Sequence, residues 1–195
     1  IPLEETLEAL GELVKQGKVR QIGLSNETPW GTMKYLELAE TKSLPRVASI
    51  QNAYNLVNRG FEIGLSEVAM HEQVGLLAYS PLAQGTLTGK YLGGQMPQGS
   101  RLALFGDGPL MMRYKGDKTQ QAIEMYVNLA KKYEIDPAQL AIHICNIQPF
   151  VTSTIIGATT MEQLKTCIDS VDLDITKEIM NEIRGIHKEI PNPAP

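Results

Sequence analysis

The sequence predicts an α/β fold with a parallel sheet, built from about four consecutive strand–helix units of a (β/α)8 barrel. Short β-rich runs alternate with helical patterns along the chain, which is typical of parallel sheets. A doubly wound dinucleotide domain would carry Gly-x-Gly-x-x-Gly after its first strand, but here that strand leads into GLSNETPWG. A complete barrel takes about 250 residues and eight strands. The 195 residues indicate only half that many strands, so we expect half of a barrel.

The first half of the chain alternates regularly between helix and strand patterns. Leucines at positions 3, 7, 10 and 13 share one helical face, and Gly17 ends that run. The run GLLAYS is apolar through its centre, which indicates a strand buried on both faces. The elements expected here are a helix over 3–16, a strand over 19–25, a helix over about 32–40 with Pro29 at an early position, a strand over 47–51, a helix over 61–73 and a strand over 75–80.

Residues 82–118 break this alternation, because they contain glycines and prolines without a clear period. So long a loop in a compact domain is usually functional or mobile. Regularity returns near Asp136-Pro137, an N-cap followed by proline at the first helical position. The expected elements are a helix over about 119–133, a helix from 137, a strand over 151–157, a helix opening in GATTMEQLKTCI and a helix over 177–188. We expect one domain over residues 1–195, with the long loop at about 82–118.

Composition and charge argue against several classes of partner. The net charge is -4 and no run of Lys or Arg occurs, which disfavours nucleic acid and anionic membranes. No apolar stretch approaches the roughly 20 residues of a transmembrane helix, and no signal peptide is evident, so we expect a cytoplasmic protein. Cys145 and Cys167 have neither metal-binding nor redox spacing and are predicted to be buried free thiols. We expect no metal site, because the three histidines are scattered.

The stretch GTLTGKY resembles a nucleotide-triphosphate loop but does not have its spacing. Such a loop has four residues between its first glycine and the Gly-Lys pair, followed by Ser or Thr. Here only three residues separate Gly85 from Gly89, and Tyr91 stands where the hydroxyl ligand belongs. An NTPase site is therefore excluded, while phosphate binding by another geometry stays open.

Polar side chains occur where all four predicted strands end, and in parallel barrels the chemistry lies at that rim. Ordinary turn and capping chemistry explains any one of them, but Gln51 needs partners if it is buried, and Tyr79 suits a planar amide-bearing ring. The residues at these ends are Ser25, Asn26, Gln51, Asn52, Tyr79, Ser80 and Gly157 to Thr160.

The last unit contains a candidate anion site. Thr160 and Gln163 have capping-box spacing, which places a helix start directly after Gly157-Ala158. Free N–H groups and the helix dipole favour an anion there, although a well-capped helix without a ligand explains the pattern equally well.

Four stretches together resemble the aldo-keto reductases: KVRQIGLSN, ASIQNAYNLVNR, AYSPLAQGTLTGKY and IIGATTMEQLKT. The resemblance covers essentially the whole chain and is to the branch with the bacterial Tas protein and the potassium-channel β subunits. It implies NADP(H)-dependent reduction of a small-molecule carbonyl on a (β/α)8 barrel, with this chain as the C-terminal half.

The resemblance also implies a set of cofactor-binding residues. Ser25, Asn26 and Gln51 match positions that hold the nicotinamide carboxamide, and Tyr79 matches the aromatic residue that stacks on its ring. The remaining matches are Ser80, Pro81, Leu82 and Gly85 around the pyrophosphate, Lys90 and Arg101 near the adenosine 2′-phosphate, and Gly157, Thr159 and Gln163 at the last helix. The family usually has Asn near the adenine, where this chain has Cys167, so one base contact is expected to be lost or weakened.

The family's catalytic Asp, Tyr, Lys and His lie before the helix with which this sequence starts, so we expect none of them here. Hydride transfer needs an acid to protonate the forming alkoxide. Neither Tyr54 nor Tyr79 has a lysine at a suitable spacing, and we assign no catalytic residue. Trp30 and Tyr54 are candidates to line a substrate pocket, with core packing as the alternative.

Three functional hypotheses follow. The first is the cofactor-binding half of an NADP(H)-dependent reductase of aldehydes or ketones. The second is a regulatory or redox-sensing module that binds NADP(H) with little turnover, and the third is a truncated inactive remnant. If this half-barrel is the whole chain, its unpaired strand edges predict self-association or poor folding.

Overall fold

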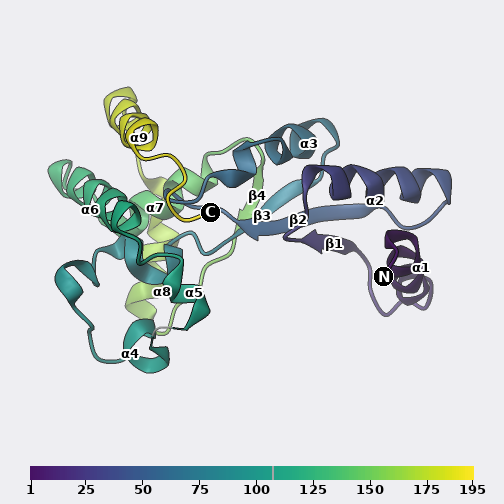
Figure 1. The fold of residues 1–195 in the computed structure, drawn as a ribbon, viewed down its shortest axis with the longest axis horizontal. Coiled ribbons are helices and arrows are strands. Elements are labelled where there is room, and N and C mark those ends of the chain that lie inside the picture. Colours follow the sequence, from purple (N-terminus) through teal and green to yellow (C-terminus); the bar gives the residue numbers. More distant parts are fainter. Residues whose placement is uncertain (107) are drawn as a thin grey trace.

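The computed structural model describes residues 1–106 and 108–195, so position 107 of the long segment lies outside the described residues (Figure 1). The strands are β1 (Ile22–Ser25), β2 (Val47–Ala53), β3 (Gly75–Tyr79) and β4 (Val151–Thr154). The α-helices are α1 (Leu3–Lys15), α2 (Pro29–Thr41), α3 (Leu65–His71), α4 (Arg101–Phe105), α5 (Pro109–Met112), α6 (Asp117–Lys132), α7 (Pro137–Asn146), α8 (Met161–Asp169) and α9 (Lys177–Glu189). The 3-10 turns are η1 (Gly60–Glu62), η2 (Ala83–Thr88), η3 (Leu92–Gly94) and η4 (Ser170–Asp172).

The four strands form one parallel sheet in the order β1-β2-β3-β4, which confirms the predicted α/β architecture. The sheet is open, since β1 and β4 each pair along one edge only. The register places Ser25 beside Gln51, Gln51 beside Leu77 and Leu77 beside Ser153. The arrangement is consistent with part of a (β/α)8 barrel that does not close within this chain.

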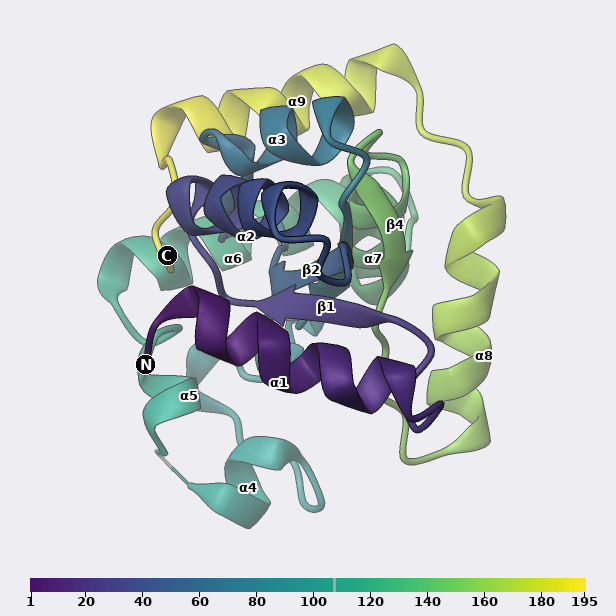
Figure 2. The ribbon, with the colours of Figure 1, turned by 90° about the vertical axis from the view of Figure 1, so that its right-hand side faces the viewer.

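The two faces of the sheet differ in burial. Ile50, Leu76 and Ala78 are buried and pack in one cluster with residues of the flanking helices, such as Leu7 and Tyr35. On the other face, side chains are exposed or half-buried, including those of Ser25, Ser49, Gln51, Tyr79 and Ser153. A parallel sheet is ordinarily covered on both faces, so this face is unusually accessible. Figure 2 shows α1 beside β1, and α2 and α3 together on one side of the sheet.

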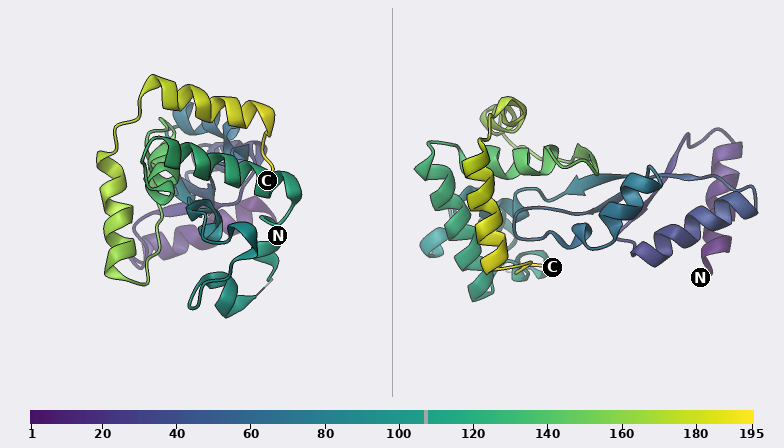
Figure 3. Two further views of the ribbon diagram at one scale, coloured as in Figure 1. Left: turned by 90° about the vertical axis from the view of Figure 1, so that its left-hand side faces the viewer. Right: turned by 90° about the horizontal axis from the view of Figure 1, so that it is seen from above.

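A second hydrophobic cluster lies beyond the strands and joins α6, α7, α9 and the turn η2. We call it the helical cluster, and the one around the sheet the sheet cluster. The view from above in Figure 3 shows the helical cluster at one end of the sheet and α1 and α2 at the other. The chain end is tied to it, since the Ala194 N–H donates to the Val57 carbonyl at 3.1 Å and Thr119 Oγ1 donates to the Pro193 carbonyl at 2.7 Å.

The helix predicted over 61–73 is interrupted at Gly64, which separates η1 from α3. Gly64 has a φ of +86°, and a Cβ there would lie 3.1 Å from Pro29. The backbone conformation favours glycine and a Cβ would crowd Pro29 of α2, so the apolar periodicity alone could not locate this break.

Two other expectations are corrected by the structure. The segment 82–118 was expected to be one loop, but it contains η2, η3, α4, α5 and the start of α6. Glycines with positive φ, among them Gly89, Gly93 and Gly106, divide it into pieces too short to show a period. The strand expected over 151–157 ends at Thr154, although Ile155 still donates its N–H to Ala78 at 2.8 Å.

Candidate functional site

Four predicted site residues meet near the carboxyl ends of β1, β2 and β3, and we call them the strand-end cluster: Ser25, Asn26, Gln51 and Tyr79. Gln51 lies within β2, which continues to Ala53 and not only to residue 51 as expected. Tyr79 Oη donates to Asn26 Oδ1 at 2.8 Å, and Asn26 Nδ2 donates to Ser25 Oγ at 3.3 Å. The Asn26 N–H donates to the Gln51 carbonyl at 2.9 Å, which continues the β1–β2 pairing. Residues far apart in sequence thus present amide and hydroxyl groups together, as the strand-end prediction requires.

Local chemistry sets the position of Asn26. Its φ is +53°, a left-handed conformation that Asn tolerates better than most residues. This turns the chain from β1 into α2, whose N-cap Thr28 accepts the Gly31 N–H at 3.0 Å, with Pro29 at the first helical position as predicted. Trp30 follows directly and is 71% exposed, so its ring remains available to line a substrate pocket.

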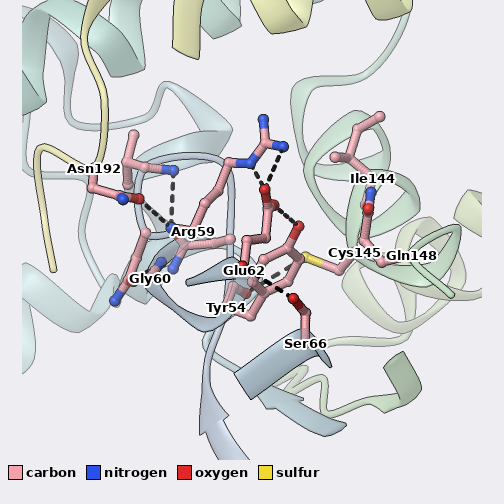
Figure 4. Close-up of polar contacts among 12 residues, drawn as sticks. Tyr54, Arg59, Gly60, Glu62, Ser66, Ile144, Cys145, Gln148 and Asn192 are labelled. Atoms are coloured by element: carbon pink, nitrogen blue, oxygen red, sulfur yellow. Dashed lines mark hydrogen bonds and ion pairs between the residues drawn. The ribbon is translucent and has the colours of Figure 1, made fainter. Parts of the chain in front are cut away.

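Tyr54, the other predicted pocket residue, lies in the core instead. It is 1% exposed, and its ring packs edge-on against Phe150 with 5.3 Å between centroids. Its hydroxyl donates to Glu62 Oε1 at 2.6 Å (Figure 4). Burial, followed by the Glu62 carboxylate, raises the pKa of the Tyr54 phenol above its ordinary value. The alternative of core packing is therefore correct for Tyr54.

An ion pair that the sequence analysis missed fixes the turn after β2. Arg59 donates from Nε and Nη2 to the two Glu62 carboxylate oxygens at 2.6 and 2.9 Å (Figure 4). Burial raises the pKa of Glu62, but hydrogen bonds from Arg59 and Tyr54 outweigh it and leave the pKa lowered. The Arg59 N–H also donates to Asn192 Oδ1 at 2.7 Å, which ties the chain end to this turn. The Arg-x-x-Glu spacing was the only sequence indication of this pair.

The chain after β3 enters a strained turn at the residues predicted to wrap a pyrophosphate. Ser80, Ala83, Gln84 and Gly85 all have positive φ, with values of 54°, 48°, 60° and 91°. Non-glycine residues in this conformation are held by their surroundings and cluster at ligand clamps. Within the turn the Ala83 N–H donates to the Ser80 carbonyl at 2.9 Å and the Gly85 N–H to the Leu82 carbonyl at 2.8 Å. Pro81 is buried and Leu82 packs on the helical cluster, so both support the turn.

Lys90 lies beside this turn. Its Nζ is 5.2 Å from the centroid of the Tyr91 ring, and a Cβ on Gly85 would lie 3.0 Å from Lys90 Nζ. The glycine therefore leaves room for the ammonium group next to the strained backbone. The structure thus places Gly85 and Lys90 side by side.

The start of α8 is capped almost as predicted. Thr160 Oγ1 accepts the Gln163 N–H at 3.2 Å, while Gln163 Oε1 accepts from the N–H and the hydroxyl of Thr159, at 2.9 and 3.1 Å. The return bond thus goes to Thr159 and not to the N-cap residue, which differs from a capping box. Residues Gly157 to Gln163 are exposed.

Arg101 is the first residue of α4 and is exposed. Figure 2 shows α4 and α8 apart from one another. Arg101 and the Thr159–Gln163 pair therefore belong to separate elements of the fold.

The two cysteines are buried and free, as predicted. Burial raises the pKa of Cys145 to about 12, and its Sγ contacts the Tyr54 and Ala141 carbonyls. Burial, with a smaller effect of Asp136, also raises the pKa of the Cys167 thiol on α8. The described part of the chain holds no group of three or more His, Cys, Asp or Glu arranged to bind a metal. Within residues 1–106 and 108–195, no helix has the length and apolar character needed to cross a bilayer.

Comparison with known proteins decides the family. The model of the aldo/keto reductase family matches residues 1–188. The chain belongs to the aldo/keto reductase family. It is 50% identical to the Protein tas of Escherichia coli (strain K12) over 195 residues, covering 100% of this chain and 56% of the relative. It is 41% identical over 194 residues to an aldo-keto reductase of Babesia bovis, covering 96% of this chain and 67% of the relative.

A third relative is named a probable voltage-gated potassium channel subunit beta, from Oryza sativa subsp. japonica. It is 30% identical over 193 residues, covering 97% of this chain and 59% of the relative. The resemblance to the Tas and channel-subunit branch of the aldo/keto reductases is thus confirmed. The chain spans about half to two thirds of the length of these relatives.

Proposed function

We propose that residues 1–195 form the NADP(H)-binding half of an aldo/keto reductase whose complete form reduces aldehydes or ketones to alcohols. The strand-end cluster is the observation that carries the proposal. With Asn26 Oδ1 accepting from Tyr79 and Nδ2 donating to Ser25, the amide keeps one acceptor and one donor position free. A carboxamide offers the complementary pair, and the half-buried Tyr79 beside it supplies an aromatic face for a planar ring.

The other predicted residues fit the rest of the cofactor. The turn from Ser80 to Gly85, in which four residues have positive φ, suits a pyrophosphate. Lys90, which lies beside that turn, supplies positive charge for the adenosine 2′-phosphate. Arg101, Thr159 and Gln163 would serve the adenosine 2′-phosphate, together with the helix start after Gly157. When bound, the nicotinamide supplies the hydride. The role of this chain's own side chains is to hold and orient the reactive ring at the strand ends.

The proposal assigns no proton donor to this chain. A general acid works best with a pKa near the operating pH. Tyr54 is unsuited because its phenol is buried, donates to a carboxylate and has a raised pKa. We infer that the acid and the groups that orient the carbonyl belong to a part of the complete protein outside these residues. Since the reaction draws on the cellular nicotinamide pool, the proposal includes a cytoplasmic location.

Cofactor binding can be tested through the fluorescence of Trp30, the single tryptophan of the sequence. Trp30 lies close in sequence to Asn26 and emits light that the reduced nicotinamide absorbs. We expect NADPH to quench this emission and to bind more tightly than NADH, because Lys90 and Arg101 favour the extra phosphate. Arg101→Ala should weaken NADPH binding several-fold, by about 1 kcal/mol, and leave NADH binding nearly unchanged. Arg184→Ala, an exposed arginine on α9, is the control.

An unchanged affinity of Arg101→Ala for NADPH would remove that residue from the site. No quenching by either nucleotide would overturn the proposal as a whole. The alternative of an NADP(H)-binding regulatory module is favoured by the channel-subunit name of the rice relative. Turnover of a broad aldehyde panel by the complete protein separates the two functions, because a sensor would bind the cofactor without appreciable reduction.

A further inference from the structure

The long segment leaves the sheet at Ser80 and returns to the helical cluster at Tyr114, and both points meet the side chain of Asn55. Asn55 Nδ2 donates to the Ser80 carbonyl at 3.0 Å. Burial raises the pKa of the Tyr114 phenol, while the positive charge of Arg113 and a hydrogen bond with the Asn55 side chain lower it. Asn55 is 1% exposed and Tyr114 is 2% exposed, so neither reaches a ligand on the surface.

The amide of Asn55 is held in one orientation by its own turn. Asn55 Oδ1 accepts the Val57 N–H at 3.0 Å, and the Asn55 and Asn58 backbones exchange two hydrogen bonds of 3.0 Å. With the oxygen used in this way, the amide nitrogen is directed to Ser80 at the start of the long segment. A carboxylate here would place an acceptor against the Ser80 carbonyl, and an alkyl side chain would leave that buried carbonyl with one partner fewer.

The Ser80 backbone needs such support. Its φ of 54° is uncommon for serine, and its carbonyl accepts from both Asn55 Nδ2 and the Ala83 N–H. The side chain of Gln84 adds a bond to Ser80 Oγ at 3.0 Å. Ser80 directly follows Tyr79 of the strand-end cluster and begins the run that ends at Gly85. The conformation of Ser80 therefore determines how the strand-end cluster and the Ser80–Gly85 turn are placed relative to each other.

We propose that Asn55 is a positioning residue that clamps the two ends of the long segment, through Ser80 and Tyr114, and thereby holds the Ser80–Gly85 turn in its binding shape. The claim that this turn binds part of the cofactor rests on the proposed function. The clamp itself is argued only from contacts within the chain. Asn55 acts through Ser80 and touches neither cofactor nor substrate.

Asn58 offers a matched control within the same turn. It is 6% exposed, and its Oδ1 accepts the Gly60 N–H at 3.3 Å, so an alanine there also removes a buried amide. We would compare Asn55→Ala and Asn58→Ala in the full chain by hydrogen exchange of residues 82–92 without nucleotide. Exchange should accelerate about tenfold in Asn55→Ala and change by less than about twofold in Asn58→Ala.

The second readout is NADPH binding followed by quenching of Trp30. Asn55→Ala should bind about tenfold more weakly and release NADPH faster, whereas Asn58→Ala should resemble the parent protein. Equal exchange of residues 82–92 in the two alanine variants would overturn the clamp, whatever the nucleotide does. Failure of the parent protein to bind NADPH would overturn the proposed function, and the exchange comparison would still decide the clamp.

Tyr114→Phe keeps the experiment decisive if Asn55→Ala does not fold. It retains the buried ring and removes only the hydroxyl that meets Asn55. We expect about threefold faster exchange over residues 113–118, with residues 65–71 of α3 unchanged as an internal control. No change over 113–118 would contradict the contact at the second end of the segment.

Discussion

The strand-end cluster and the strained turn from Ser80 to Gly85 are held by different kinds of structure. Strand register places Ser25 beside Gln51, and a side-chain bond between Tyr79 and Asn26 completes that cluster. The turn, in contrast, depends on positive-φ residues and on packing of η2 against α6 and α7. Neighbouring strands preorganise the first region, whereas the second needs separate anchors such as Asn55. Changes in the two regions should therefore have different consequences.

The largest expected effect concerns the sheet that carries the strand-end cluster. A polypeptide of residues 1–195 should self-associate, because its sheet has one accessible face and two unpaired parallel edges. A twofold axis along the strands would let β4 of each copy pair with β1 of the other. Light scattering after size exclusion measures the mass. A monodisperse monomer that melts cooperatively would contradict this expectation.

A lysine on the accessible face sharpens that test. Ser153→Lys places a charge on the exposed edge strand β4 and should shift the polypeptide toward monomer. Asn181→Lys adds the same charge on the exposed surface of α9 and should leave the mass distribution unchanged. If both lysines act alike, overall charge rather than the strand edge controls association.

A smaller but specific effect is expected within the strand-end cluster. Asn26→Ala removes the amide that links Ser25 to Tyr79, so NADPH should bind about tenfold more weakly, which corresponds to about 1.4 kcal/mol. Tyr79→Phe keeps the ring and removes one bond, so its effect should be smaller. Asn128→Ala, exposed on α6, serves as the control in the same fluorescence titration. Equal affinity in Asn26→Ala and Asn128→Ala would exclude Asn26 from the site.

The strained turn is tested by two glycines that share a positive φ. Gly85 and Gly93 have φ values of 91° and 67°, but a Cβ on Gly85 would meet Lys90, while one on Gly93 would meet nothing within 4 Å. Alanine at either position should lower the free energy of unfolding by about 1 kcal/mol. Only Gly85→Ala should also weaken NADPH binding, by about threefold, because it displaces the lysine. Equal binding by both variants would show that Lys90 does not serve the phosphate.

The smallest expected effect is a pH dependence of thermal stability that arises in the helical cluster and not in the sheet cluster. Burial, followed by the positive charge of Arg59, lowers the pKa of His187 on α9, and Glu62 opposes this. The folded state thus favours neutral His187. The stability that follows from this is fully present above the unfolded pKa of about 6.5 and is lost as pH falls through the lower folded pKa. His187→Gln should flatten the decline of thermal stability between about pH 7 and pH 5. His71→Gln, exposed on α3, is the control for the loss of a histidine, and identical slopes in both variants would exclude His187.

Much of this molecule was predictable because the interactions that specify it are local. The helix starts at Pro137 and Met161 follow from their N-caps, Asp136 and Thr160. The alternation of apolar runs likewise predicts a parallel sheet, and polar residues at strand ends must gather at one rim. The break at Gly64 was not predictable, since it depends on the contact of that glycine with Pro29 of another helix.

The candidate site likewise combines features that the sequence predicted with features that depend on tertiary contacts. Residue types along the chain were enough to nominate Asn26, Tyr79 and Gly85, and to place the chain among the aldo-keto reductases. The bond between Tyr79 and Asn26 joins residues 53 positions apart, and the burial of Tyr54 depends on Phe150 and Glu62. Such contacts are set by strand register and by which side chains share the space between packed elements. Only the tertiary structure could therefore assign Tyr54 to the core and Asn55 to the base of the long segment.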